Sequence, residues 1–201
     1  MLLLAAETGF SAGSLLLQIL LLLALIFLNA FFAASEIAII SLNDAKLHKM
    51  AEEGHKKAQQ VLKLTADSSN FLATIQIGVT LAGFLTSATA AQSLAEPLAR
   101  WFVGLIPALQ PFLGTVQGVS VVVVTLIMSY FSLVLGELVP KRIAMQKAES
   151  LSFKVIGILR VVAAVTKPFV KLLSFSTNVV VRLFGMDPHA DEENVTEEEI
   201  R

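Results

Sequence analysis

Glu137 is the residue whose type and surroundings best fit a chemical role. It ends a run of 36 residues without Asp, Glu, Lys or Arg that begins after Arg100. Gly136 precedes it and Pro140 follows, and because proline has no backbone N–H, the carbonyl oxygen of Gly136 loses its usual helical donor. A carboxylate beside such a carbonyl offers the oxygen ligands that Mg²⁺ and Ca²⁺ prefer. The alternative is a Glu137 at the membrane boundary that pairs with Lys141, and the spacing leaves both open.

Neutral oxygen-bearing side chains occur in two other apolar stretches. Ser35 lies near the end of the first stretch, while Asn70 and Thr74 lie one helical turn apart at the start of the second. Convergence of the three stretches would place these oxygens and the glutamate around one ion. The alternative role for Asn70 is a helix N-cap. Gln76 and Thr80 are candidates for a second ion, and hydrogen bonding between helices is their alternative role.

Motifs of soluble enzymes are missing from the sequence. It contains no G-x-G-x-x-G, Walker, H-E-x-x-H or G-x-S-x-G pattern. Its three histidines, His48, His55 and His189, lack the spacing of metal ligands, and we expect them to be solvated. We therefore expect neither an enzyme nor a nucleic-acid-binding protein.

The composition indicates the elements that must position these residues. The 201 residues are 55% hydrophobic and 15% charged, with a mean hydropathy of +0.75, whereas soluble domains carry about 25% charge. The absence of cysteine excludes a disulfide-stapled secreted module. Residues 15–40, 71–91 and 116–138 are each long enough to cross a bilayer, which takes about 20 residues. The predicted fold class is an all-α integral membrane protein with three transmembrane helices.

Lysine and arginine set the expected orientation. Residues 41–67 hold five lysines, residues 92–115 hold only Arg100, and no Lys or Arg precedes the first stretch. Because positive residues favour the cytoplasmic side, we expect a cell-membrane protein with its N-terminus outside and its C-terminus in the cytoplasm. A cleaved signal peptide is the alternative for the first stretch, but its apolar run is too long and no basic residue precedes it.

The connections between the stretches differ in character. Residues 43–64 contain good helix formers and mixed charges, which predict one cytosolic helix. Residues 96–112 are too apolar for a free loop and too interrupted for a span, so we expect a re-entrant or interfacial segment on the outer side. The interrupting residues are Pro97, Pro107 and Pro111.

Residues 149–185 combine apolar residues with a basic stripe. Pro168 is expected to divide them into two juxtamembrane helices, and the stripe suits the anionic inner leaflet of the membrane. A fourth span with Arg160 buried is the less favourable alternative, because a buried unpaired arginine is costly. Removing the seven acids and one base of residues 187–201 from the totals of 16 and 15 leaves residues 1–186 with a net charge of +5. We expect residues 1–186 to form a membrane domain, and residues 187–201 an acidic linker toward a further cytosolic domain.

Three strings of the sequence resemble the transmembrane domain of the CorC/cyclin-M (CNNM) family. They are Phe-Phe-Ala-Ala-Ser-Glu-Ile-Ala at residues 31–38, Asn-Phe-Leu-Ala-Thr-Ile-Gln-Ile-Gly-Val-Thr-Leu at residues 70–81, and Gly-Glu-Leu-Val-Pro-Lys at residues 136–141. The resemblance covers about residues 10–201, and the ending is similar to the linker before a regulatory CBS-domain pair.

The resemblance implies a magnesium transporter that exports Mg²⁺ in exchange for Na⁺. It also implies three spans per protomer, a juxtamembrane helical belt, a homodimer and an inward-open acidic cavity. By position, Glu137 becomes the anionic ligand and Gly136 a carbonyl ligand, and the neutral oxygen ligands become Ser35, Asn70 and Thr74. The competing hypothesis is a non-transporting membrane anchor and Mg²⁺ sensor for a cytosolic regulatory domain.

Overall fold

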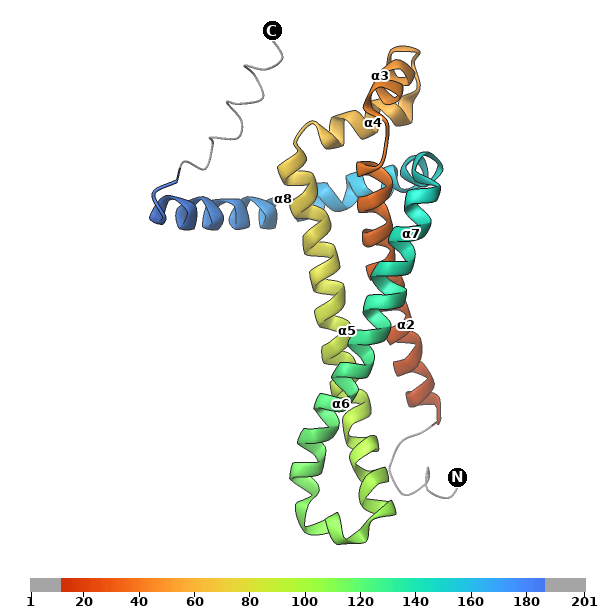
Figure 1. Cartoon of the computed structure of the whole chain (residues 1–201), viewed down its shortest axis with the longest axis vertical. Coiled ribbons are helices and arrows are strands. Elements are labelled where there is room, and N and C mark those ends of the chain that lie inside the picture. Colours follow the sequence, from red (N-terminus) through yellow and green to blue (C-terminus); the bar gives the residue numbers. More distant parts are fainter. Residues whose placement is uncertain (1–11, 187–201) are drawn as a thin grey trace.

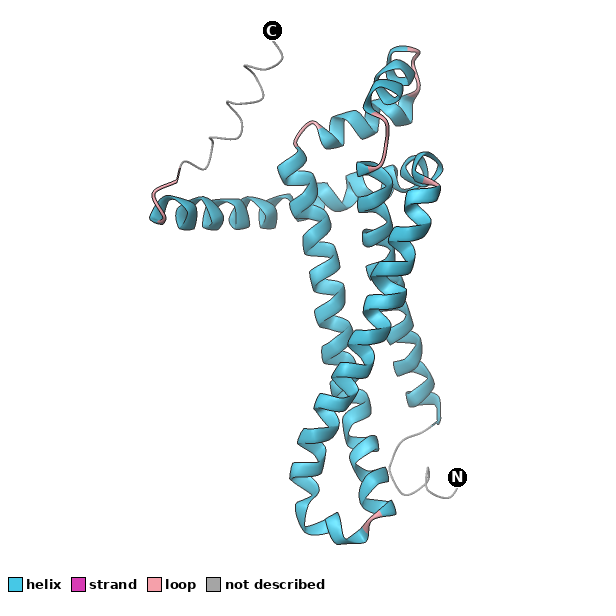
Figure 2. Cartoon of the chain, in the orientation of Figure 1, coloured by secondary structure: helices cyan, strands magenta, loops and turns pink. Residues whose placement is uncertain are grey.

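The computed structural model describes residues 12–186, and within that range every regular element is a helix (Figures 1 and 2). The elements are α2 (Ala12–Ile40), α3 (Asp44–Glu52), α4 (Lys56–Thr65), α5 (Ser68–Leu105), η1 (Pro107–Phe112), α6 (Leu113–Leu133), η2 (Val134–Leu138), α7 (Val139–Gln146) and α8 (Ala148–Leu183). The predicted all-α class is confirmed. The expected acidic linker at residues 187–201 lies outside the described residues.

Three stretches of the described chain are long and apolar enough to cross a membrane, which confirms the three predicted spans. They are Gly13–Ile40, Ser68–Leu105 and Pro107–Gln146. The third combines η1, α6, η2 and α7, which follow one another almost without interruption. In Figure 1, α5 and α6 form a long hairpin that reaches well beyond the first residues of α2. At 1.5 Å per residue, the 38 residues of α5 span about 57 Å, which exceeds a hydrocarbon core of ~30 Å.

The side chains are distributed as expected for helices surrounded by lipid. Large apolar residues such as Phe27, Val122 and Leu126 are exposed, whereas small residues such as Ala33 and Ala90 are buried. Apolar side chains gain little from burial against each other when lipid is the alternative, so close approach of backbones contributes more to helix association. The phenyl ring of Phe32 lies over Gly78, where a Cβ would come within 2.7 Å of it.

The connections differ from the sequence predictions in two places. Residues 43–64 form two helices, α3 and α4, because Gly54 adopts a φ of +89°, a left-handed conformation that breaks the run. Residues 96–105 continue α5 through Pro97, and only residues 107–112 turn, as a 3₁₀-helix. Ala95, Ala99 and Val103 form a buried stripe on this part of α5, and its packing offsets the hydrogen bond lost at Pro97. The expected separate re-entrant segment is therefore the end of a helical hairpin.

The helix α8 runs crosswise to the three long helices (Figure 1). The predicted division at Pro168 is wrong, since one helix continues from Ala148 to Leu183. Proline removes one hydrogen bond, and buried residues on both sides, Leu159 and Val170, hold the helix in place. The described helices that are long and apolar enough to span a membrane do not include α8. This favours the interfacial interpretation of α8 over a fourth span.

Candidate cation-binding site

Glu137 lies in a single π-helical turn, η2, that interrupts the third long helix. The N–H of Val139 donates to the carbonyl oxygen of Val134, five residues earlier, and Pro140 follows with no N–H to donate. Gly136 is buried against α2, and a Cβ there would lie 2.9 Å from Nδ2 of Asn29. Turns of this kind occur frequently at functional sites. The glycine and the widened turn together bring the backbone beside Glu137 close to α2.

The carboxylate of Glu137 belongs to a three-residue charge cluster. Nζ of Lys141 lies 3.0 Å from Oε1 of Glu137 and 3.2 Å from Oε2 of Glu36. The three side chains are partly buried, with 28%, 32% and 23% of their surface exposed for Lys141, Glu137 and Glu36. The pairing of Glu137 with Lys141, which spacing offered as an alternative, is present. Its extension to Glu36 on α2 gives the cluster a net charge of −1.

A polar hollow of about 350 Å³ lies next to Glu137 between α2, α5 and α6. Its oxygen-bearing wall residues are Asn29, Thr80, Ser87, Ser129, Ser132 and Glu137. Oδ1 of Asn29 is buried and has no hydrogen-bond partner among the described residues. Leaving a buried amide oxygen without a donor costs about 1–3 kcal/mol. The arrangement therefore provides one carboxylate, several neutral oxygens and an acceptor that a cation could satisfy.

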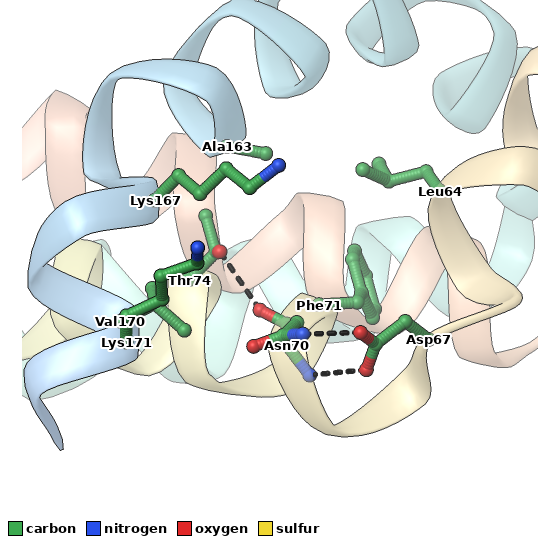
Figure 3. A pocket seen from close by; sticks show the side chains of 9 residues that line it. All are labelled: Leu64, Asp67, Asn70, Phe71, Thr74, Ala163, Lys167, Val170 and Lys171. Carbon is green, nitrogen blue, oxygen red and sulfur yellow. Dashed lines mark hydrogen bonds between the residues drawn. The ribbon is translucent and has the colours of Figure 1, made fainter. Parts of the chain in front are cut away.

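Asn70 and Thr74 line a different hollow, of about 220 Å³, between α5 and α8 (Figure 3). Asp67 caps α5 by accepting from the backbone N–H of Asn70 at 3.0 Å, and it also accepts from Nδ2 of Asn70. The predicted alternative of Asn70 as the N-cap is therefore wrong by three residues. Oγ1 of Thr74 donates to the carbonyl oxygen of Asn70 at 2.8 Å.

Two lysines extend from α8 into this second hollow. Figure 3 shows Lys167 and Lys171 on the side opposite Asp67 and Asn70. One aspartate and two lysines give the hollow a net charge of +1, which opposes the entry of a cation. In this structure the neutral oxygens of Asn70 and Thr74 thus face positive charge.

Ser35 borders neither of the two hollows. It is fully buried, and its Oγ donates to the carbonyl oxygen of Phe31 at 2.6 Å. Gln76 donates from Nε2 to Oγ1 of Thr80 at 3.4 Å within α5, so the hydrogen bond expected between helices occurs along one helix. Of the predicted ligands, Gly136 and Glu137 adjoin each other because they are consecutive in the chain, and the structure places Ser35, Asn70 and Thr74 elsewhere.

Several residues of the polar hollow were not foreseen from the sequence. Asn29 is a buried amide in the middle of a largely apolar helix, and Ser129 and Ser132 lie about one helical turn apart. Polar groups at membrane depth are costly, which is the signal that could have marked them. Among the described residues no three His, Asp or Glu side chains cluster as a metal site would require. A cation bound here would depend mainly on neutral oxygens.

Three long apolar helices around a polar hollow, with a crosswise helix at one end, define an integral membrane domain of transporter-like architecture. The cyclin M transmembrane N-terminal domain (CNNM) matches residues 20–201. The chain therefore belongs to this family, and the resemblance noted in the sequence is confirmed.

Curated relatives support the same assignment. The UPF0053 protein sll0260 of Synechocystis is 40% identical over 190 residues, which cover 94% of this chain and 41% of that protein. The UPF0053 protein YugS of Bacillus subtilis is 30% identical, over 93% of this chain and 43% of that protein. A Haemophilus influenzae protein named "Polyamine export protein" is also 30% identical, over 90% and 41%. The chain spans about two-fifths of the length of these relatives.

Proposed function

We propose that this membrane domain transports Mg²⁺, with Glu137 as the anionic ligand. The observation that carries the proposal is a carboxylate, held by a π-helical turn, at the wall of an open hollow with six oxygen-bearing residues between apolar helices. Ionisable residues at such positions mark ion pathways. The family membership and the unpartnered Oδ1 of Asn29 support the same function.

The ligand chemistry follows from the demands of the ion. Mg²⁺ takes about six oxygen ligands in an octahedron and loses water reluctantly, so Glu137 supplies the charge while neutral oxygens replace water. Gly136 precedes Glu137 in the chain, and Asn29 on α2 lines the same hollow as Glu137, so the Gly136 carbonyl and the Asn29 amide oxygen are the first neutral ligands that we propose. The predicted ligands Ser35, Asn70 and Thr74 lie away from this hollow, with Asn70 and Thr74 facing α8, so hydroxyls of the hollow and water fill the remaining positions around the ion.

Transport needs an orientation and a source of free energy. The N-terminus lies outside and the C-terminus in the cytoplasm, which places α8 on the anionic inner leaflet of the cell membrane. Na⁺ entering the cell drives Mg²⁺ out as the small-residue helix faces rock past one another. Two copies of the chain assemble as a homodimer.

Flux through proteoliposomes tests this function. The wild-type chain, Glu137→Gln or a control variant is reconstituted into vesicles that enclose a Mg²⁺-sensitive dye. The control is Glu96→Gln, whose partner is the exposed Arg100. We expect Glu137→Gln to lose at least about tenfold in rate, because removing one partner of a charge-dependent interaction costs more than 1.4 kcal/mol. The control should match the wild type, and an opposed Na⁺ gradient should accelerate both. A wild-type chain that moves no Mg²⁺ would favour the membrane anchor and sensor instead.

A second candidate cargo is an organic polycation. The Haemophilus influenzae relative carries the name "Polyamine export protein", and in this chain a primary ammonium, that of Lys141, already lies between two carboxylates. The same vesicles with radiolabelled putrescine separate the two cargoes. Faster movement of putrescine than of Mg²⁺ would favour the polyamine.

A further inference from the structure

We propose that Lys141 is a tethered cation that occupies Glu137 when the site is empty and moves onto Glu36 when a transported cation binds. This inference rests on the proposed function of Glu137 as a cation ligand, and it adds a control on affinity to that site. Glu36 then serves as the place where the lysine is held during transport.

The geometry allows this exchange without a large movement. The ammonium of Lys141 contacts one oxygen of each carboxylate, at 3.0 Å from Glu137 and 3.2 Å from Glu36, and both distances are within hydrogen-bond range. A lysine ammonium is a point charge on a flexible four-carbon stem. It can therefore release Glu137 and keep Glu36, so that its charge is never left without a partner.

Electrostatics makes the ammonium and the incoming ion competitors. Like charges a few ångströms apart repel each other, and the repulsion is larger where water is partly excluded. The three side chains of the cluster are each less than one-third exposed, at 28%, 23% and 32%. A divalent cation at Glu137 must therefore displace the ammonium, and Glu36 lowers the free energy of the displaced state.

The competition has a use in transport. A site that binds its ion too tightly releases it slowly, so affinity alone does not increase turnover. The returning ammonium of Lys141 replaces the departing ion at Glu137, and the carboxylate is not left bare in a partly buried place. Lys141 thereby weakens binding and assists release.

A purely structural role for Lys141 makes different predictions. The residue joins α7 to α2 through Glu36, and a simple tie between helices would stabilise both the fold and the hollow. Removing such a tie would lower the melting temperature and weaken Mg²⁺ binding. Removing a competitor strengthens binding instead, so the sign of the change in affinity separates the two roles.

The experiment is a Mg²⁺ titration of the purified chain in detergent by calorimetry, with the melting temperature as a check of folding. We expect Lys141→Met to bind Mg²⁺ about three- to tenfold more tightly and Glu36→Gln to bind it more weakly by a similar factor. Lys141→Arg keeps the charge and should stay near the wild type. The matched control is Arg142→Met, which removes an exposed neighbouring charge and should change affinity little.

A double variant tests whether Glu36 acts through the lysine. If it does, adding Glu36→Gln to Lys141→Met should weaken binding much less than the same change in the wild type. An undiminished effect would make Glu36 a direct ligand and overturn the proposal. Unchanged or weaker Mg²⁺ binding by Lys141→Met would also overturn the proposal. If Lys141→Met does not fold, Glu36→Gln serves as the test, and unchanged or tighter Mg²⁺ binding by Glu36→Gln would overturn the proposal. Undiminished binding by Glu137→Gln would instead refute the proposed function.

Discussion

Two hollows among the described residues, the one beside η2 and the one between α5 and α8, use similar neutral side chains but differ in the sign of their charge. The hollow beside η2, here called the acidic hollow, combines Asn29 and serines with the carboxylate of Glu137. The hollow between α5 and α8, here called the basic hollow, combines Asn70 and Thr74 with Lys167 and Lys171. Amide and hydroxyl oxygens can serve a cation in either place, so the nearby charges decide. The comparison teaches that a set of oxygen ligands has meaning only together with the charges that the fold places around it.

The largest expected effect comes from neutralising each hollow in turn. Glu137→Gln should weaken Mg²⁺ binding by more than about tenfold, because the hollow beside η2 loses the carboxylate that lines it. The double change Lys167→Gln and Lys171→Gln should leave the affinity within about threefold, since those lysines act in the other hollow. Calorimetric titration of both variants with Mg²⁺ measures this difference. Equal losses of affinity in the two variants would show that the two hollows do not differ in this way.

A second prediction concerns the close contact behind Glu137. In Gly136→Ala the new Cβ would lie 2.9 Å from Nδ2 of Asn29, so the Asn29 side chain or η2 must shift, at a cost of about 1–3 kcal/mol. The melting temperature and Mg²⁺ affinity should both fall. Gly118→Ala in α6 is the control, because nothing lies within 4 Å of its added Cβ. Equal melting temperatures and Mg²⁺ affinities in the two variants would show that the packing of η2 on α2 contributes to neither property.

A third prediction separates stability from binding within the acidic hollow. Asn29→Leu removes the buried oxygen that has no partner among the described residues, which should raise stability by about 1 kcal/mol. The same change should weaken Mg²⁺ binding several-fold, because a neutral ligand is lost. Thr74→Val, in the basic hollow, should leave Mg²⁺ affinity unchanged while removing its hydrogen bond to Asn70. Thermal unfolding and titration of both variants test the contrast, and a weaker affinity in Thr74→Val alone would reverse it.

The smallest expected effect is confined to the basic hollow. Asp67→Ala removes the N-cap of α5, whose side chain accepts from the backbone N–H of Asn70, and should cost about 0.5–2 kcal/mol of stability. Mg²⁺ affinity should stay the same, since this carboxylate is not at the acidic hollow. Asp67→Asn retains a capping oxygen and should lose little stability by thermal unfolding. Weaker Mg²⁺ binding in Asp67→Ala would mean that the two hollows are coupled.

Much of the fold and part of the site could be predicted from the sequence. The three spans followed from charge-free stretches, because a hydrocarbon core excludes unpaired charge and requires internally bonded helices. Glu137 and Gly136 followed from the same rule and from the missing N–H of Pro140. The family followed from three short strings, and the match over residues 20–201 confirms it.

The rest depended on how each helix is rotated about its own axis. Helices that are apolar on every side carry no periodic pattern that marks the inward face, so sequence spacing could not show that Asn29 faces the hollow of Glu137. It also could not show that Thr74 faces α8. The contact between Lys141 and Glu36 joins residues more than a hundred positions apart.

The sequence by itself thus determined which segments enter the membrane and which acid lies among them, because the cost of charge in lipid acts on each segment locally. Only the tertiary structure decided which oxygens and which lysine meet that acid. Those contacts arise from the close approach that Gly136 and the π-helical turn allow between α2 and the third long helix, and such an approach is a property of packed helices rather than of any one segment.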